Sequence, residues 1–172
     1  AGAGNRPHTD FAAGEDCTGG NCERRAQYLT AAADLLVADL TEMVANWAAD
    51  GAARHAVTDD PQAGLNAMLT GMGSLSYGEQ AGERMKLGLL LHDPEEEHDC
   101  FSDNTHVSHL NDAIGVQNVY LGKYVRVDGS VVEGPSLSQV IAASDAALDA
   151  EIKALLDDTI ARMNVMADRA EG

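Results

Sequence analysis

The chain has 172 residues, enough for one hydrophobic core, so a single domain is the default expectation. Its 28 acidic and 11 basic residues give a formal net charge of −17, and such a surface repels phosphate backbones and anionic membranes. Nucleic acid is therefore excluded as an expected partner, whereas adaptation to a salty habitat would produce the same composition. No apolar run approaches the roughly 20 residues that span a bilayer, so no transmembrane segment is expected.

A loop is predicted over residues 1–21, where glycine and proline break every regular pattern. Cys17 and Cys22 stand five positions apart, with two glycines between them that let the chain turn back. We predict a disulfide between them, which implies an oxidising compartment. A metal clip would need two further ligands, and only His8 is close. Because the sequence starts at Ala1 without an initiator methionine, we expect that a leader was removed or that the chain is part of a longer protein.

Residues 22–172 are predicted to form a helical domain, because aromatic residues make up only 4% of the chain and alanine is abundant. From Cys22 onward, apolar residues recur at intervals of three and four and predict the clearest helix, which ends near Gly51. A second helix is predicted to begin at Pro61, with Asp59 or Asp60 as its N-cap.

The segment SLSYGEQAGERMKLGLLLH is predicted to be the next helix, with Gly71 and Gly73 as candidate breaks before it and Pro94 ending it. At α-helical spacing, one face would allow close approach of a neighbouring backbone at its glycines. That face consists of Leu75, Gly78, Gly82, Met85 and Leu89. Glu79, Glu83 and Arg84 form either a solvated surface or a buried group with Arg84 as the partner of a carboxylate.

Another helix is predicted to begin near Thr105. The stretch YVRVDGSVVEGP is interpreted as a loop or a marginal hairpin that turns at Asp128 and Gly129. The tail from residue 136 to 169 is predicted to hold two helical segments, the second capped by Ser144 or Asp145. The sum is an all-α fold, an up-and-down bundle of about five helices.

The most concentrated chemistry lies in DPEEEHDCFSDNTHVSH, residues 93–109. Glu95-x-x-His98 has the spacing of a di-iron ligand pair, but such a centre needs the motif twice and only one copy is present. A mononuclear metal site drawn from His98, His106 and His109 is the sharper hypothesis, and a solvated acidic turn is the plainer one. The remaining cysteine, Cys100, is interpreted as a buried structural thiol.

The run from Ser102 to Thr105 contains the residue types that cap helices and close turns, so some of them are expected to hold the loop or to face a ligand. The sequence has no H-E-x-x-H, no G-x-S-x-G and no glycine loop that could cradle phosphate.

Two longer stretches, GMGSLSYGEQAGERMKLGLLLHDPEEEHDCFSDNTH and GVQNVYLG, resemble the second half of imelysin-like proteins, and the GAGNRP start and CTGGNCERRAQYL also fit that family. These are iron-regulated bacterial proteins of the periplasm or outer membrane, classified among the HxxE peptidases. The resemblance implies an all-helical fold of two bundle-like halves. The family's G-x-H-x-x-E motif belongs to the first half and does not occur here, since His92-x-x-Glu95 has Leu90 where the motif has glycine.

The resemblance also implies a set of residues at the junction with a first half that carries G-x-H-x-x-E. Arg84 and Asp103 are expected to be buried and paired, and His98 and His106 are expected to contact a metal or a small ligand. The pocket or interface set is Ser76, Tyr77, Glu79, Glu83, Arg84, Ser102, Asp103, Asn104 and Thr105, with Glu97 and Phe101 also matching the family pattern.

The function expected from this resemblance is iron uptake or metal binding in the envelope of a Gram-negative bacterium, by binding and not by turnover. Iron or another divalent metal is the expected ligand, and the G-x-H-x-x-E half and iron-transport proteins are the expected partners. Two alternatives remain open. One is a metal-dependent peptidase completed by the first half, and the other is an acidic helical scaffold for a transport or redox partner.

Overall fold

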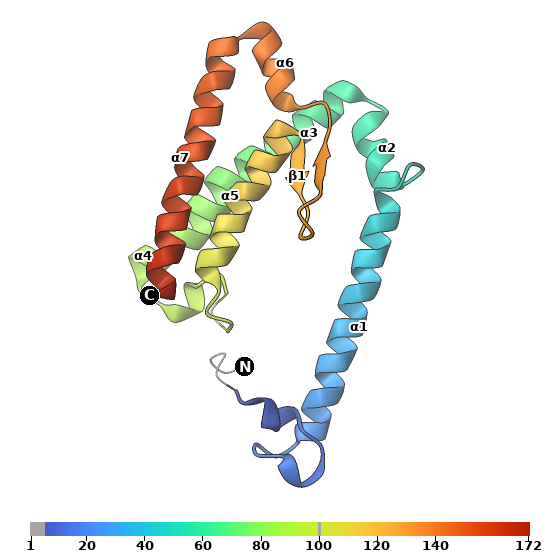
Figure 1. Ribbon diagram of the computed structural model, residues 1–172, viewed down its shortest axis with the longest axis vertical. Coiled ribbons are helices and arrows are strands. Elements are labelled where there is room, and N and C mark those ends of the chain that lie inside the picture. The colour runs from blue at the N-terminus through green and yellow to red at the C-terminus, as the bar shows by residue number, and fades with distance from the viewer. Residues whose placement is uncertain (1–5, 100) are drawn as a thin grey trace. The chain divides into compact units, whose positions relative to one another are not determined.

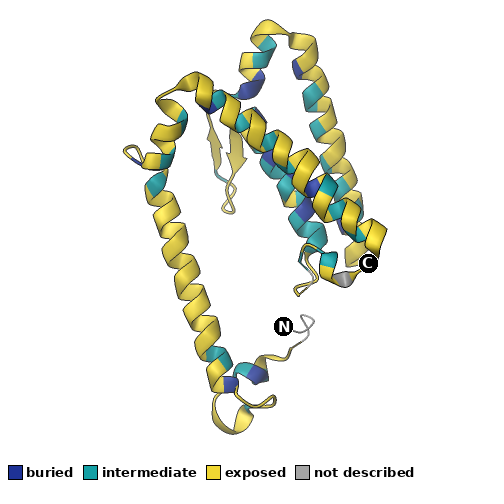
Figure 2. Cartoon of the chain, turned by 180° about the vertical axis from the view of Figure 1, so that it is seen from behind, coloured by how far each residue is buried: buried dark blue, intermediate teal, exposed yellow. Residues whose placement is uncertain are grey.

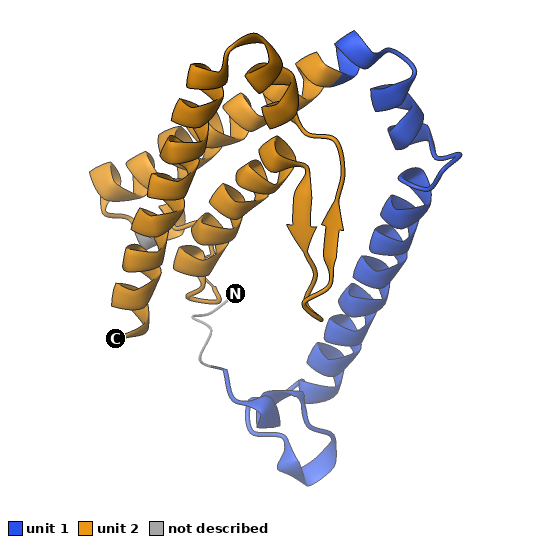
Figure 3. Cartoon of the chain, turned by 45° about the horizontal axis from the view of Figure 1, so that its top comes forward, with its two compact units in different colours: residues 1–64 blue, residues 65–172 orange. Residues whose placement is uncertain are grey.

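The structure is a computed structural model that describes residues 6–99 and 101–172. Two compact units divide the chain, unit 1 over Ala1–Gly64 and unit 2 over Leu65–Gly172 (Figure 3). The border falls inside one helix, α3 (Pro61–Gly73), so the loop over residues 1–21 belongs to unit 1 together with the first long helix.

Unit 1 is built around α1 (Cys22–Asn46), preceded by two short 3₁₀ helices, η1 (His8–Phe11) and η2 (Gly14–Asp16), and followed by α2 (Ala52–Thr58) (Figure 1). The predicted disulfide between Cys17 and Cys22 is confirmed, with sulfur atoms 2.07 Å apart. Helix α1 follows the predicted segment closely, but Cys22 is its only buried residue (Figure 2). The periodic apolar residues of α1 are therefore exposed rather than packed within unit 1.

The start of α3 follows the predicted capping chemistry. An Asp60 side-chain oxygen accepts hydrogen bonds from the backbone N–H groups of Gln62 and Ala63, each at 3.1 Å. Pro61 occupies the first helical position, where a missing N–H costs nothing. Helix α2 was not anticipated, because its seven residues carry no periodic apolar pattern.

Unit 2 continues from α3 into a π-helix, η3 (Ser74–Lys86), and then α4 (Leu87–Leu91) and a 3₁₀ turn, η4 (Pro94–Glu96). Helix α5 (Thr105–Leu121), a hairpin, α6 (Leu137–Ser144) and α7 (Ala146–Glu171) follow. Helices α5, α6 and α7 pack against one another, and η3 also contacts α5 (Figure 1). The buried apolar side chains of unit 2 are Ala113, Val116, Tyr120, Leu137 and Ala167. The predicted all-α bundle is confirmed.

A buried carboxylate joins the three packed helices of unit 2. Asp149 of α7 is only 6% exposed and accepts hydrogen bonds from the Tyr120 hydroxyl of α5 and the Lys153 ammonium, each at 2.8 Å. Ser138 of α6 also hydrogen-bonds to it, and these contacts, the Lys153 bond first, lower the pKa of Asp149. The carboxylate is thus ionised and partnered, as a buried charge requires.

The π-helix changes which residues share a face. The chain stays helical through Gly73 instead of breaking there. In η3 the partly or fully buried positions include Leu75, Gln80 and Met85, which are spaced by five residues, as wider π-helical turns require. The predicted close approach of a neighbouring backbone is wrong for Gly78, because no other element of the described chain lies within 4 Å of the place that a Cβ would occupy.

The stretch after α5 forms a short antiparallel hairpin, β1 (Lys123–Val125) with β2 (Val131–Glu133). It turns at the predicted Asp128 and Gly129, where Gly129 has a φ of 81° and an Asp128 oxygen accepts from the Ser130 N–H at 2.9 Å. At its base, Gly122 ends α5 in a left-handed conformation, and a Cβ there would lie 2.8 Å from the Pro135 carbonyl oxygen. Only glycine fits that position without displacement.

The second segment of the predicted tail is capped as expected: an Asp145 oxygen accepts from the N–H groups of Ala147 and Leu148 at 3.0 and 2.9 Å. None of the helices in the described part of the chain combines the length and hydrophobicity needed to cross a bilayer.

Candidate functional site

The polar segment between α4 and α5 folds into a tight turn at one end of unit 2. Helix α4 ends at His92, which has a left-handed φ of 52°. Further on, the Asp99 carbonyl oxygen accepts from the N–H groups of Ser102 and Asp103 at 3.0 and 3.1 Å, while the Thr105 hydroxyl accepts from the Asp99 N–H at 3.0 Å. The prediction that these polar residues shape the loop is confirmed at Thr105 and at Ser102, whose hydroxyl donates to the Asp99 carbonyl at 3.3 Å. Cys100, expected to be a buried thiol, lies outside the described residues.

The turn brings His98 beside His109, eleven positions later on α5. Their ring centroids are 5.5 Å apart and their planes are tilted by 34°. His109 is only 3% exposed, and its backbone carbonyl accepts from the Gln80 side chain of η3 at 2.7 Å. Burial, with a smaller contribution from the neighbouring His98 charge, lowers the pKa of His109. The imidazole of His109 is therefore neutral at pH 7 and able to donate a lone pair.

Two buried polar atoms at this turn, Asp99 Oδ2 and His109 Nδ1, have no hydrogen-bond partner among residues 6–99 and 101–172. An unpaired buried polar atom costs roughly 1–3 kcal/mol, so native proteins keep few of them. Asp99 follows His98 in the chain and His109 contacts its ring, so a polar group that paired with these two atoms would be stabilising.

Two cavities lie against these residues. The more polar one, of about 430 Å³, is lined by Arg84, Glu95, Glu97, His98, Asp99, Phe101 and Ser102. A more apolar one, of about 300 Å³, is lined by Arg84, Met85, Gly88, Leu89, Asp93, Glu97, Thr105, His109 and Met166. Three carboxylates and one guanidinium line the polar cavity, so its field favours cations.

The two histidines that were predicted to bind metal have different partners in the structure. His106 is on α5, and its Nε2 lies 2.8 Å from an oxygen of Glu171, so it connects the start of α5 to the end of α7. The ring that lies beside His98 is instead that of His109. Metal binding by His98 and His106 remains a prediction.

The remaining predicted residues are only partly brought together. Arg84 lines both cavities, whereas Tyr77 is 86% exposed and lines a separate hollow on η3. The Ser76 hydroxyl donates to the Met72 carbonyl at the end of α3. Glu79 and Glu83 are exposed as well.

The expected burial and pairing of Arg84 with Asp103 is not found. The Arg84 side chain is 48% exposed, with only a loose 3.7 Å contact to Glu79. Asp103 occupies the left-handed position of an exposed turn, with a φ of 53°. Both charges keep their hydration, which is less costly than burial.

No three histidine, cysteine, aspartate or glutamate side chains converge as a metal site within residues 6–99 and 101–172. The contact between His98 and His109 therefore does not amount to a complete metal site within those residues. Sequence reasoning included His109 among three histidines but could not select it, because its position depends on how the turn folds back. Asp99 was missed, and its only sequence signal is its place next to His98.

The fold and the site define an all-α protein with an acidic cavity lined by His98 and a more apolar cavity lined by His109. A model of the imelysin family matches residues 1–172, and the chain belongs to this family. The predicted family is therefore confirmed. No curated protein sequence gives a significant match.

Proposed function

We propose that this imelysin-family protein is a metal-binding component of the bacterial envelope, with iron as its cargo, that acts by binding and not by turnover. The observation that carries the proposal is the placement of His98 beside His109, next to the unpaired oxygen of Asp99. The site is proposed to lie between the polar cavity, which His98 lines, and the apolar cavity, which His109 lines.

The ring geometry supports a shared metal ion. Zinc-like ions bind imidazole nitrogen at about 2.0–2.1 Å, so two imidazoles on one tetrahedral ion have ring centres roughly 5 Å apart. The observed 5.5 Å between the His98 and His109 centroids is close to that spacing. The lowered pKa of His109 adds to this, because metals bind the neutral imidazole and no proton has to leave it.

The charges around the pair also support a cation. Glu95, Glu97 and Asp99 outweigh Arg84 in the polar cavity, and imidazole combined with carboxylate suits iron or zinc. The Arg84 guanidinium would neutralise an anionic co-ligand, so we expect the metal to bind together with such an anion. The two imidazoles would supply part of a coordination shell, and water or groups beyond these residues would complete it.

The proposal is tested by titrating the full chain with ferrous, ferric and zinc ions in a calorimeter. We expect a dissociation constant tighter than millimolar for at least one of them. His98→Ala and His109→Ala should each weaken binding at least tenfold, since each removes one of the two imidazoles.

His55→Ala is the matched control, because His55 is in unit 1 and pairs with Asp59 at 2.9 Å. His106→Ala decides between the two histidine assignments: retained affinity favours the pair with His109, and lost affinity favours the predicted pair with His106. Binding no tighter than millimolar for all three ions would overturn the proposed function.

A further inference from the structure

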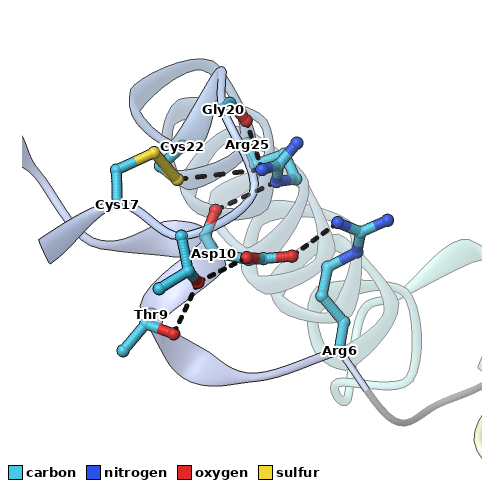
Figure 4. Close-up of polar contacts among 8 residues, drawn as sticks. Arg6, Thr9, Asp10, Cys17, Gly20, Cys22 and Arg25 are labelled. Carbon is cyan, nitrogen blue, oxygen red and sulfur yellow. Dashed lines mark hydrogen bonds and ion pairs between the residues drawn. A yellow bond between two sulfur atoms is a disulfide. The ribbon is translucent and has the colours of Figure 1, made fainter.

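We propose that the Cys17–Cys22 disulfide is a thiol-exchange site, in which an incoming dithiol attacks Cys17 and Cys22 departs as a stabilised thiolate. The proposal concerns unit 1 alone and is independent of the proposed metal site. It rests on the unequal surroundings of the two sulfur atoms (Figure 4).

The surroundings of Cys22 favour a negative sulfur. Cys22 is the first residue of α1, where unpaired backbone N–H groups and the helix dipole stabilise an anion. The Arg25 guanidinium donates to Cys22 Sγ at 3.7 Å. Arg25 is held there by its bonds to the Gly20 and Asp10 carbonyl oxygens, the latter at 2.9 Å (Figure 4). The cation is therefore positioned before any bond breaks.

The other charged groups around the disulfide do not favour a negative charge on Cys17. The Asp10 carboxylate of η1 accepts from Arg6 and from Thr18, each at 2.7 Å, so its charge is already neutralised locally. Glu15 and Asp16 of η2 directly precede Cys17 and disfavour a thiolate on that sulfur. On α1, Glu23 and Arg24 are both exposed and contribute opposite charges.

The solvent exposure of the two cysteines also favours attack on Cys17. Cys22 is 2% exposed, whereas Cys17 is partly exposed, so an external thiol reaches Cys17 more easily. The attacking thiolate forms a bond to Cys17 Sγ, the bond between the two cysteine sulfurs breaks, and its electron pair remains on Cys22. The second thiol of the reagent then releases Cys17, and the dithiol ends as a disulfide, so two electrons pass from reagent to protein.

The state of Cys22 can be measured directly. In the Cys17→Ser/Cys100→Ser protein, Cys22 is the only thiol, and thiolate absorbance at 240 nm reports its titration. We expect a pKa below the ordinary thiol value of about 8.5. A value at or above 8.5 would overturn the proposal, and this measurement leaves Arg25 unchanged.

The role of Arg25 is tested by equilibrating Cys100→Ser protein with dithiothreitol, an uncharged dithiol that the acidic surface does not repel. Arg25→Met should shift the equilibrium toward the disulfide by about tenfold, which corresponds to one pKa unit. Arg24→Met removes the same charge from the neighbouring position and is the matched control. Equal shifts in the two variants would overturn the proposal.

The direction of attack is read by treating oxidised Cys100→Ser protein with 2-mercaptoethanol and quenching with N-ethylmaleimide. Peptide mass spectrometry should find the mercaptoethanol adduct on Cys17 and the maleimide on Cys22. The reverse labelling, or no reduction under conditions that reduce an unstructured peptide of residues 15–24, identifies a purely structural disulfide and overturns the proposal.

Discussion

Among single residues, Tyr120 has the environment that should make folding stability depend most clearly on pH. It is 1% exposed and donates to Asp149 at 2.8 Å, and burial together with this bond raises the pKa of Tyr120 to about 12. An unfolded tyrosine loses its proton near pH 10. Between these values the unfolded state binds fewer protons than the folded state, so the contribution to stability is complete below pH 10 and is lost as the pH rises toward 12.

Tyr120→Phe should therefore lower the free energy of unfolding at pH 7 by about 1–2 kcal/mol, since one buried hydrogen bond to a charged group is removed. It should also abolish the decrease in stability between pH 10 and 12, because that decrease is caused by deprotonation of Tyr120. Urea denaturation across this range measures both effects. Tyr124→Phe is the control because Tyr124 is 51% exposed, and equal effects of the two substitutions would contradict the prediction.

The candidate site shows what single-residue reasoning could and could not predict. The turn that precedes α5 was predicted correctly at Ser102 and Thr105, because capping and turn residues act on their immediate neighbours. The contact between His98 and His109 could not be predicted from the sequence, because it depends on the left-handed turn at Asp103 and on where α5 packs.

Among the elements, helices with local start signals were predicted and the π-helix was not. Asp60 and Asp145 cap α3 and α7 as expected, since each side chain bonds to N–H groups two and three positions ahead. In η3 the same residue types fit α-helical and π-helical turns equally, and the choice depends on tertiary packing. Buried Gln80 occupies a position that α-helical spacing had not assigned to the packed face.

Gln80 connects η3 to α5, and its substitution should loosen that contact. Gln80→Ala removes the buried 2.7 Å bond to the His109 carbonyl and should destabilise unit 2 by about 1–2 kcal/mol. Gln117→Ala is the matched control, because the Gln117 side chain makes an equally short bond to Asp157 on the exposed surface. Hydrogen exchange should become faster in η3 for the first variant alone, and faster exchange in both variants to the same degree would contradict this role of Gln80.

For the whole molecule, the two units differ in how they bury apolar surface. Unit 2 buries apolar side chains of α5, α6 and α7, whereas α1 in unit 1 leaves Leu36, Leu40 and Val44 more than half exposed. The helical period of α1 was predicted correctly, but a periodic apolar face does not say what covers it. The stability of the two units should differ accordingly, because most helical stability comes from packing.

We therefore expect the backbone amides of α1 to exchange with solvent faster than those of α5 in the folded chain. Among their described residues, α1 buries only Cys22, whereas α5 buries His109, Ala113, Val116 and Tyr120. Opening α1 thus exposes little additional surface, and exchange there proceeds by local opening at a low free energy. Hydrogen–deuterium exchange with mass spectrometry compares the two helices within one sample, which removes differences in pH and temperature. Equal protection of α1 and α5 would mean that the apolar face of α1 is covered in solution.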